Sequence, residues 1–146
     1  MKTKALTVVL FLLLVSVVCG GPFDPRATFG QSPGRDLDGA LKRSKADKKR
    51  VLLFYWNTKE KDNYPGSDMT FFMELEETKK LLKDNFTLVV LDRDHKDVKP
   101  YVSPGQNTEK PQWVFIDFDG KMLKTAEVHR RGDSGLKTLK ELMAIP

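Results

Sequence analysis

The chain has 146 residues, which is the length of one ordinary domain, and 40% of them are hydrophobic, enough to bury a core. Its formal net charge is +5 at pH 7, with 25 Lys and Arg against 20 Asp and Glu. Basic and acidic residues are interspersed, without the concentrated basic face and aromatic side chains that nucleic-acid binding requires. We therefore expect a mildly basic single-domain protein that does not bind nucleic acid.

The first 20 residues have the layout of a secretory signal peptide. Lys2 and Lys4 form a short positive region, residues 5–18 are an almost unbroken apolar run, and small residues follow. At 1.5 Å per residue this run reaches about 21 Å, short of the roughly 30 Å hydrocarbon layer. We therefore expect cleavage after Gly20, no permanent membrane span, and a secreted or periplasmic protein.

Cys19 is the only cysteine of the chain and lies within this leader. A lipoprotein anchored through Cys19 is the minor alternative, because Val18 stands where lipoprotein signals usually have a small residue. A chain cut after Gly20 contains no cysteine, so no disulfide can stabilise the exported domain. Its stability must come from packing.

Residues 21–34 are rich in Gly and Pro and lack periodicity, so they predict an extended linker without core residues. The domain is expected to occupy residues 35–146. Its first element is a short amphipathic helix at residues 36–48, where apolar residues recur on one face.

Three continuous apolar runs predict the strands of a buried, mostly parallel sheet, at residues 51–56, 86–91 and 113–118. A polar loop at 57–66 follows the first run. Residues 67–84 then have helical spacing, with Phe71, Leu75 and Leu82 on one stripe and Ser67 as the N-cap. Strand, helix and strand in this order predict a right-handed βαβ unit.

The end of the chain predicts a hairpin and a closing helix. Asp119 and Gly120 indicate a two-residue hairpin turn that leads into a return strand at 121–128. Residues 133–144 have helical spacing, with Leu136, Leu139 and Met143 as the apolar stripe. The elements together predict an α/β fold, a mixed four-stranded sheet flanked by helices on both faces, with an extra N-terminal helix.

This order, over residues 36–146, resembles the thioredoxin superfamily. The branch to which the chain is most similar is that of exported thioredoxin-like domains with a helix before the first strand, which includes the anterior-gradient-type proteins. The residues that carry the resemblance are Leu53-Phe54-Tyr55-Trp56, Met73-Glu74, Glu77-Thr78, Asp92-Arg93-Asp94, Lys110-Pro111 and the run from Trp113 to Lys121.

The resemblance implies a cis proline at Pro111 and a dithiol slot at the start of the first long helix. Counting back from the helix places the slot at Ser67 and Thr70, and counting forward from the strand places it near Lys59 and Asp62. Neither position pair contains cysteine, and hydroxyl groups do not form disulfides. We therefore expect a redox-inactive protein that is not an enzyme of thiol–disulfide exchange.

The resemblance also implies a groove beside the Lys110-Pro111 turn, where thioredoxin relatives bind extended peptide. The residues expected to bind a polypeptide or protein partner there are Trp56, Tyr64, Ser67, Thr70, Lys110 and Pro111. Two alternatives remain: an oxidoreductase-related protein that acts through a partner's thiols, and a purely structural exported domain.

An acidic cluster with one histidine follows the second predicted strand, at Asp92, Asp94, His95 and Asp97. Its spacing matches no metal-binding loop, and Lys96 compensates part of its charge. We expect solvated loop residues here, and neither a metal nor a cofactor.

Overall fold

The structure is a computed structural model that describes residues 23–58 and 64–146. The predicted signal peptide, Cys19 and the alternative slot at Lys59 and Asp62 lie outside the described residues. Within the described ranges, no helix is long and apolar enough to cross a membrane.

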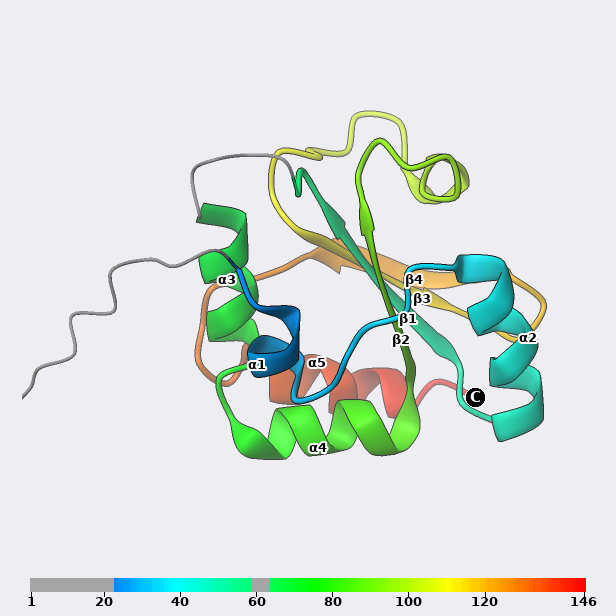
Figure 1. Ribbon diagram of the computed structural model, residues 1–146, viewed down its shortest axis with the longest axis horizontal. Helices are drawn as coiled ribbons and strands as arrows, with labels where there is room; N and C mark the ends of the chain where they lie inside the picture. The colour runs from blue at the N-terminus through cyan, green and yellow to red at the C-terminus, as the bar shows by residue number, and fades with distance from the viewer. Residues whose placement is uncertain (1–22, 59–63) are drawn as a thin grey trace, which may run out of the picture.

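Four strands form one mixed sheet in the order β2-β1-β3-β4 (Figure 1). The strands are β1 (Val51–Trp56), β2 (Thr87–Asp92), β3 (Gln112–Ile116) and β4 (Met122–Glu127). β1 pairs in parallel with β2 and antiparallel with β3, which pairs antiparallel with β4. The predicted fold class is therefore confirmed.

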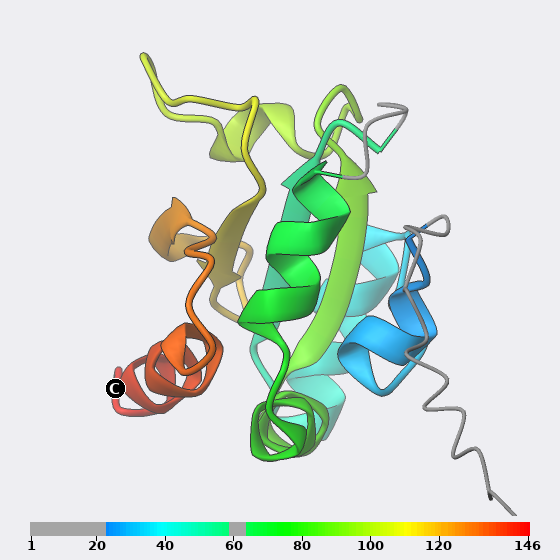
Figure 2. The same cartoon turned by 90° about the vertical axis from the view of Figure 1, so that its left-hand side faces the viewer.

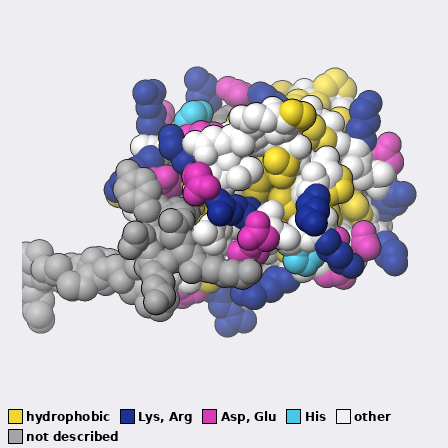
Figure 3. All heavy atoms as spheres, turned by 90° about the horizontal axis from the view of Figure 1, so that it is seen from above, with side chains coloured by type: hydrophobic (Ala, Val, Ile, Leu, Met, Phe, Trp, Pro, Cys, Tyr) yellow, Lys and Arg dark blue, Asp and Glu magenta, His cyan; other side chains and the backbone are white. Residues whose placement is uncertain are grey.

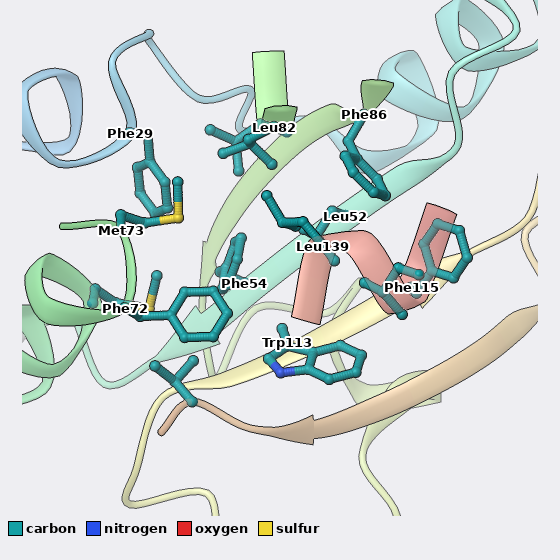
Figure 4. Close-up of a cluster of buried hydrophobic side chains, with 14 of the residues drawn as sticks. Phe29, Leu52, Phe54, Phe72, Met73, Leu82, Phe86, Trp113, Phe115 and Leu139 are labelled. Carbon is teal, nitrogen blue, oxygen red and sulfur yellow. The ribbon is translucent and has the colours of Figure 1, made fainter. Parts of the chain in front are cut away.

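The central strand β1 supplies side chains to two separate cores, because successive residues of a strand point to opposite faces. Leu52, Phe54 and Trp56 join the larger core, beneath α3 (Tyr64–Phe72), α4 (Glu76–Asn85) and α5 (Ser134–Met143). The alternate residues join the smaller core, which α2 (Leu37–Asp47) covers. Figure 2 shows α3 in front of the central strands and α2 partly hidden behind them, and Figure 4 shows the larger core. Burial on both faces explains the unbroken apolar run.

The predicted linker contains a helix that belongs to the domain. Helix α1 (Pro25–Phe29) begins after Asp24, whose carboxylate accepts a hydrogen bond from the Arg26 N–H at 2.9 Å. Phe29 is fully buried, with its ring centroid 5.4 Å from that of Phe54. Gly34 extends the attachment by backbone hydrogen bonds of 3.0 Å with β2. The prediction of a linker without core residues is therefore wrong for residues 23–34.

The predicted helix at 67–84 is two helices, α3 and α4, separated by a break. Leu75 at the break has an extended backbone, with φ −77° and ψ 133°. Because α3 already begins at Tyr64, Ser67 lies inside it and is not the N-cap. The break also divides the predicted stripe: Phe71 and Leu75 are 39% and 37% exposed, whereas Phe72 is buried.

The hairpin lies where it was predicted, but its loop is longer. The Asp117 N–H donates to the Lys121 carbonyl at 2.8 Å, and the Gly120 N–H donates to the Asp117 carbonyl at 3.0 Å. These bonds enclose a loop at 118–120 in which Gly120 has φ +88°, a left-handed conformation that glycine adopts without strain. The predicted two-residue turn is therefore wrong in length. In the closing helix α5, Leu139 is buried as predicted, while Met143 is 45% exposed.

Candidate functional site

The predicted binding residues lie where β1 ends, α3 begins and the chain enters β3. Figure 3 looks down on this end of the molecule, where charged side chains border the visible surface. Trp56, the last residue of β1, is only 3% exposed, and its ring meets the ring of Phe23 edge-on at 5.1 Å. Trp56 is thus a core residue beneath the site. Tyr64 is the first residue of α3, and its side chain lies outside the described part of the chain.

Ser67 and Thr70, the predicted slot residues, both lie on α3. Ser67 is half-buried and Thr70 is exposed. The Thr70 hydroxyl donates to the Gly66 carbonyl at 3.0 Å and lies 3.4 Å from the Thr28 hydroxyl of α1. Thr70 therefore has a structural role, since it joins α3 to the N-terminal helix.

The Lys110–Pro111 turn differs from the predicted one, because no peptide bond within the described residues is cis. The prediction of a cis Pro111 is therefore wrong. A trans bond is the lower-energy isomer, and the turn is held without a cis bond. The Pro111 carbonyl accepts from the Val128 N–H at 2.8 Å, and the Lys110 carbonyl accepts from the Gln112 amide at 3.2 Å.

Gln112 is a site residue that the sequence analysis missed. It is 2% exposed, and its amide nitrogen also donates to the Asn107 carbonyl at 2.8 Å. Its amide oxygen accepts from the Gln106 side chain at 2.9 Å. These bonds fix the loop before β3 against the sheet. A lone amide residue opening an apolar strand is the signal that could have found it.

Asp68, between the two predicted slot residues, is the second site residue that was missed. Its side chain is only 9% exposed, and its buried Oδ1 has no hydrogen-bond partner within the described part of the chain. Arg130 lies beside it, with its Nε 3.9 Å from Oδ1. Burial raises the pKa of Asp68 above its ordinary value. The positive charges of Arg130 and Lys110 lower this pKa in part, and the negative charge of Glu127 adds to the rise. The signal for Asp68 is an acidic residue amid apolar ones, in Gly66-Ser67-Asp68-Met69.

Four charged groups from separate elements therefore meet at this end of the sheet. Asp68 belongs to α3, Lys110 to the turn before β3, Glu127 to the end of β4, and Arg130 to the segment after β4. The Lys110 ammonium binds the Glu127 carboxylate at 2.8 Å. Arg130 also lies over Phe71, with its guanidinium carbon 4.5 Å from the ring centroid. A half-exposed cation thus bridges a buried carboxyl group and an exposed aromatic ring.

The acidic cluster after β2 has a local structural role. The Asp92 carboxylate accepts hydrogen bonds from the Thr58 N–H at 3.0 Å, the Thr58 hydroxyl at 2.6 Å and the Asp94 N–H at 3.0 Å. His95 Nδ1 accepts from the Asp97 N–H at 3.2 Å. Within residues 23–58 and 64–146, no group of three or more His, Cys, Asp or Glu side chains could hold a metal ion.

The sequence matches no protein-family model and no curated protein. Its structure is similar to the solution structure of a thioredoxin from Thermus thermophilus, with a TM-score of 0.60 and 18% identity over 75% of this chain and 85% of that one. It is also similar to the crystal structure of a poplar thioredoxin h mutant, with a TM-score of 0.51 and 18% identity over 75% and 78% of the two chains. Sheet order, helix placement and these neighbours lead to one conclusion: the chain has a thioredoxin-like fold.

Proposed function

We propose that the protein is an exported, redox-inactive thioredoxin-like domain of the anterior-gradient-like kind, and that it binds an extended polypeptide beside the Lys110–Pro111 turn. The observation that carries this proposal is the composition of α3. This helix packs on the sheet, and the predicted slot on it holds Ser67 and Thr70, with Asp68 between them. A hydroxyl or carboxyl group there cannot perform thiol–disulfide exchange, which favours binding over catalysis at this surface.

The structure changes which residues such a polypeptide would contact. Trp56 and Pro111 are buried and would lie beneath the bound polypeptide. Phe71, Lys110 and Arg130 have exposed side chains around it. Phe71 would pack against an apolar side chain of the polypeptide, because aromatic residues contribute a large share of the energy at protein interfaces.

A peptide-binding experiment with matched variants tests this proposal. A fluorescent library of extended peptides would be titrated with the mature chain, and hits would be measured again with Phe71→Ala and with Met143→Ala. Both residues are exposed, but Met143 lies at the far end of α5. We expect Phe71→Ala to weaken binding about tenfold, as loss of an interface aromatic does, and Met143→Ala to leave it unchanged. Equal effects of the two variants contradict the proposed surface.

The alternative, an oxidoreductase-related protein that acts through a partner's thiols, has its own test. Insulin reduction by the purified mature chain, alone and with dithiol-containing proteins of the same compartment, measures thiol turnover. We expect no turnover above background by the chain alone, since it contains no cysteine after Gly20.

The mass of the secreted protein tests the cleavage site, because a chain that begins at Gly21 has lost Cys19.

A further inference from the structure

The end of the sheet opposite the proposed binding surface carries a group of lysines that the proposed function does not use. At this end β1 begins with Val51, which pairs with Thr87 of β2 and with Ile116 of β3. Three residues separate α2 from β1 and one separates α4 from β2, so both helices end here. The six residues of β1 span about 20 Å, which separates the two ends.

Two hollows at this end share the side chain of Phe118. The first has a volume of about 210 Å³ and is lined on one side by Lys48 and on another by Met143. The second is lined by charged side chains of α2 and of the turn after β3, namely Asp38, Lys42, Lys45 and Asp119. Phe118 is half-buried and Met143 is 45% exposed. Lysines and accessible apolar side chains therefore lie together on this end.

Lys49 and Lys83 add two more cations. The Lys49 ammonium donates to the Lys83 carbonyl at 3.2 Å, which joins the segment before β1 to the last turn of α4. We call the four lysines of this surface the basic end: Lys45, Lys48, Lys49 and Lys83. Within residues 23–58 and 64–146, none of the four is in an ion pair.

The carboxylates nearest the basic end do not cancel its charge. Asp84 is bonded to Lys80, and Asp117 accepts from Arg50 at 2.9 Å. Asp47 is exposed between two of the lysines in sequence and offsets one of the four. The basic end therefore has an excess of positive charge that its own carboxylates do not neutralise.

Lys48 occupies a backbone position that favours glycine. It follows the last residue of α2 with φ +54° and ψ +35°, and within the described ranges it is the only residue other than glycine with a positive φ. This left-handed conformation costs free energy for a lysine that glycine would avoid. The backbone thus gives no reason for a lysine here, whereas its exposed ammonium group can serve a ligand.

We propose that the basic end binds the surface of a lipid bilayer with anionic head groups. A lysine near such a surface strengthens binding about fivefold. Phe118 and Met143 favour a bilayer over a soluble polyanion, because apolar side chains and lysine stems can enter the boundary between head groups and acyl chains. The inference goes beyond the proposed function and does not depend on it, since the Lys110–Pro111 turn would face away from the membrane.

Co-sedimentation with vesicles tests this proposal. The mature chain would be mixed with vesicles of phosphatidylglycerol and phosphatidylcholine in equal parts, and with vesicles of phosphatidylcholine alone. We expect binding to the anionic vesicles only. It should be strong in about 0.1 M salt and lost in about 1 M salt, where the screening length falls to about 3 Å.

Two double variants with the same loss of charge locate the surface. Lys48→Gln with Lys83→Gln should weaken binding to the anionic vesicles about tenfold or more, because each lysine contributes about fivefold. The control is Lys96→Gln with Arg131→Gln. Both control side chains are exposed and follow β2 and β4, which end beside the Lys110–Pro111 turn. They should change binding less than about twofold, because they lie beyond the screening length of about 10 Å.

Lys48→Gly separates binding from folding. Glycine adopts the left-handed conformation without strain, so we expect an equal or higher urea midpoint together with about fivefold weaker binding to the vesicles. Unchanged binding in this variant, or equal losses in the two double variants, overturns the proposal. Binding to heparin without binding to anionic vesicles would assign the lysines to a soluble polyanion and would also overturn it.

Discussion

Replacement of Phe29 by alanine tests whether the segment before residue 35 is part of the folded domain. The Phe29 ring is fully buried, packs at 5.4 Å on Phe54 and meets Phe23 edge-on at 6.3 Å. Removal of a fully buried phenylalanine ring costs about 3–5 kcal/mol, because the transfer energy is lost and a cavity remains. We therefore expect Phe29→Ala to lower the free energy of unfolding by about that amount.

Urea unfolding of the mature chain, followed by circular dichroism, measures this loss. The matched control is Phe71→Ala, which removes the same atoms from a side chain that is 39% exposed. It should cost only about 1–2 kcal/mol, because part of this side chain is already in water. If Phe29→Ala costs no more than the control, residues 23–34 do not contribute to the core and our description of α1 is refuted.

Two further substitutions test the packing of α5 and the turn before β4. A Cβ atom at Gly135 would clash with the carbonyl oxygen of Phe72, so Gly135→Ala should lower the free energy of unfolding by about 3 kcal/mol or more. A urea midpoint equal to that of the unsubstituted chain would contradict the close approach of α5 to α3. Hydrogen bonds from the Phe118 N–H and from Arg50 lower the pKa of Asp117. The ionised carboxylate therefore stabilises the fold at any pH above the ordinary aspartate pKa, and this stabilisation is lost as the pH falls through the lowered pKa of the folded protein. Asp117→Asn should therefore cost about 1 kcal/mol at neutral pH and nothing in strong acid, and a cost that persists in acid would assign the effect to packing.

The sequence predicts the sheet well because its strands are defined by burial. All residues of β1 are apolar, and the structure places β1 at the predicted residues 51–56 between β2 and β3. The short helix α1 could not be predicted in the same way. Phe29 is the only large apolar residue of its five positions, which is too few to show a period.

The break between α3 and α4 has a tertiary cause that the local sequence does not show. Residues 73–75 contain neither proline nor glycine, so helical spacing continues through them. In the structure, Phe72 and Met73 are buried in the larger core, and the N-terminal turn of α5 approaches the last turn of α3 at Gly135. Packing on the sheet and on α5 therefore overrides local helix propensity at Leu75.

The elements that carry the candidate site could be predicted to lie together, but the side chains exposed on them could not. The resemblance brought α3 and the Lys110–Pro111 turn to one end of the sheet, where the structure also has them, but Trp56 and Pro111 are buried. The residues missed, Asp68 and Gln112, are polar groups whose importance comes from burial by distant segments. Spacing along the chain does not reveal such burial.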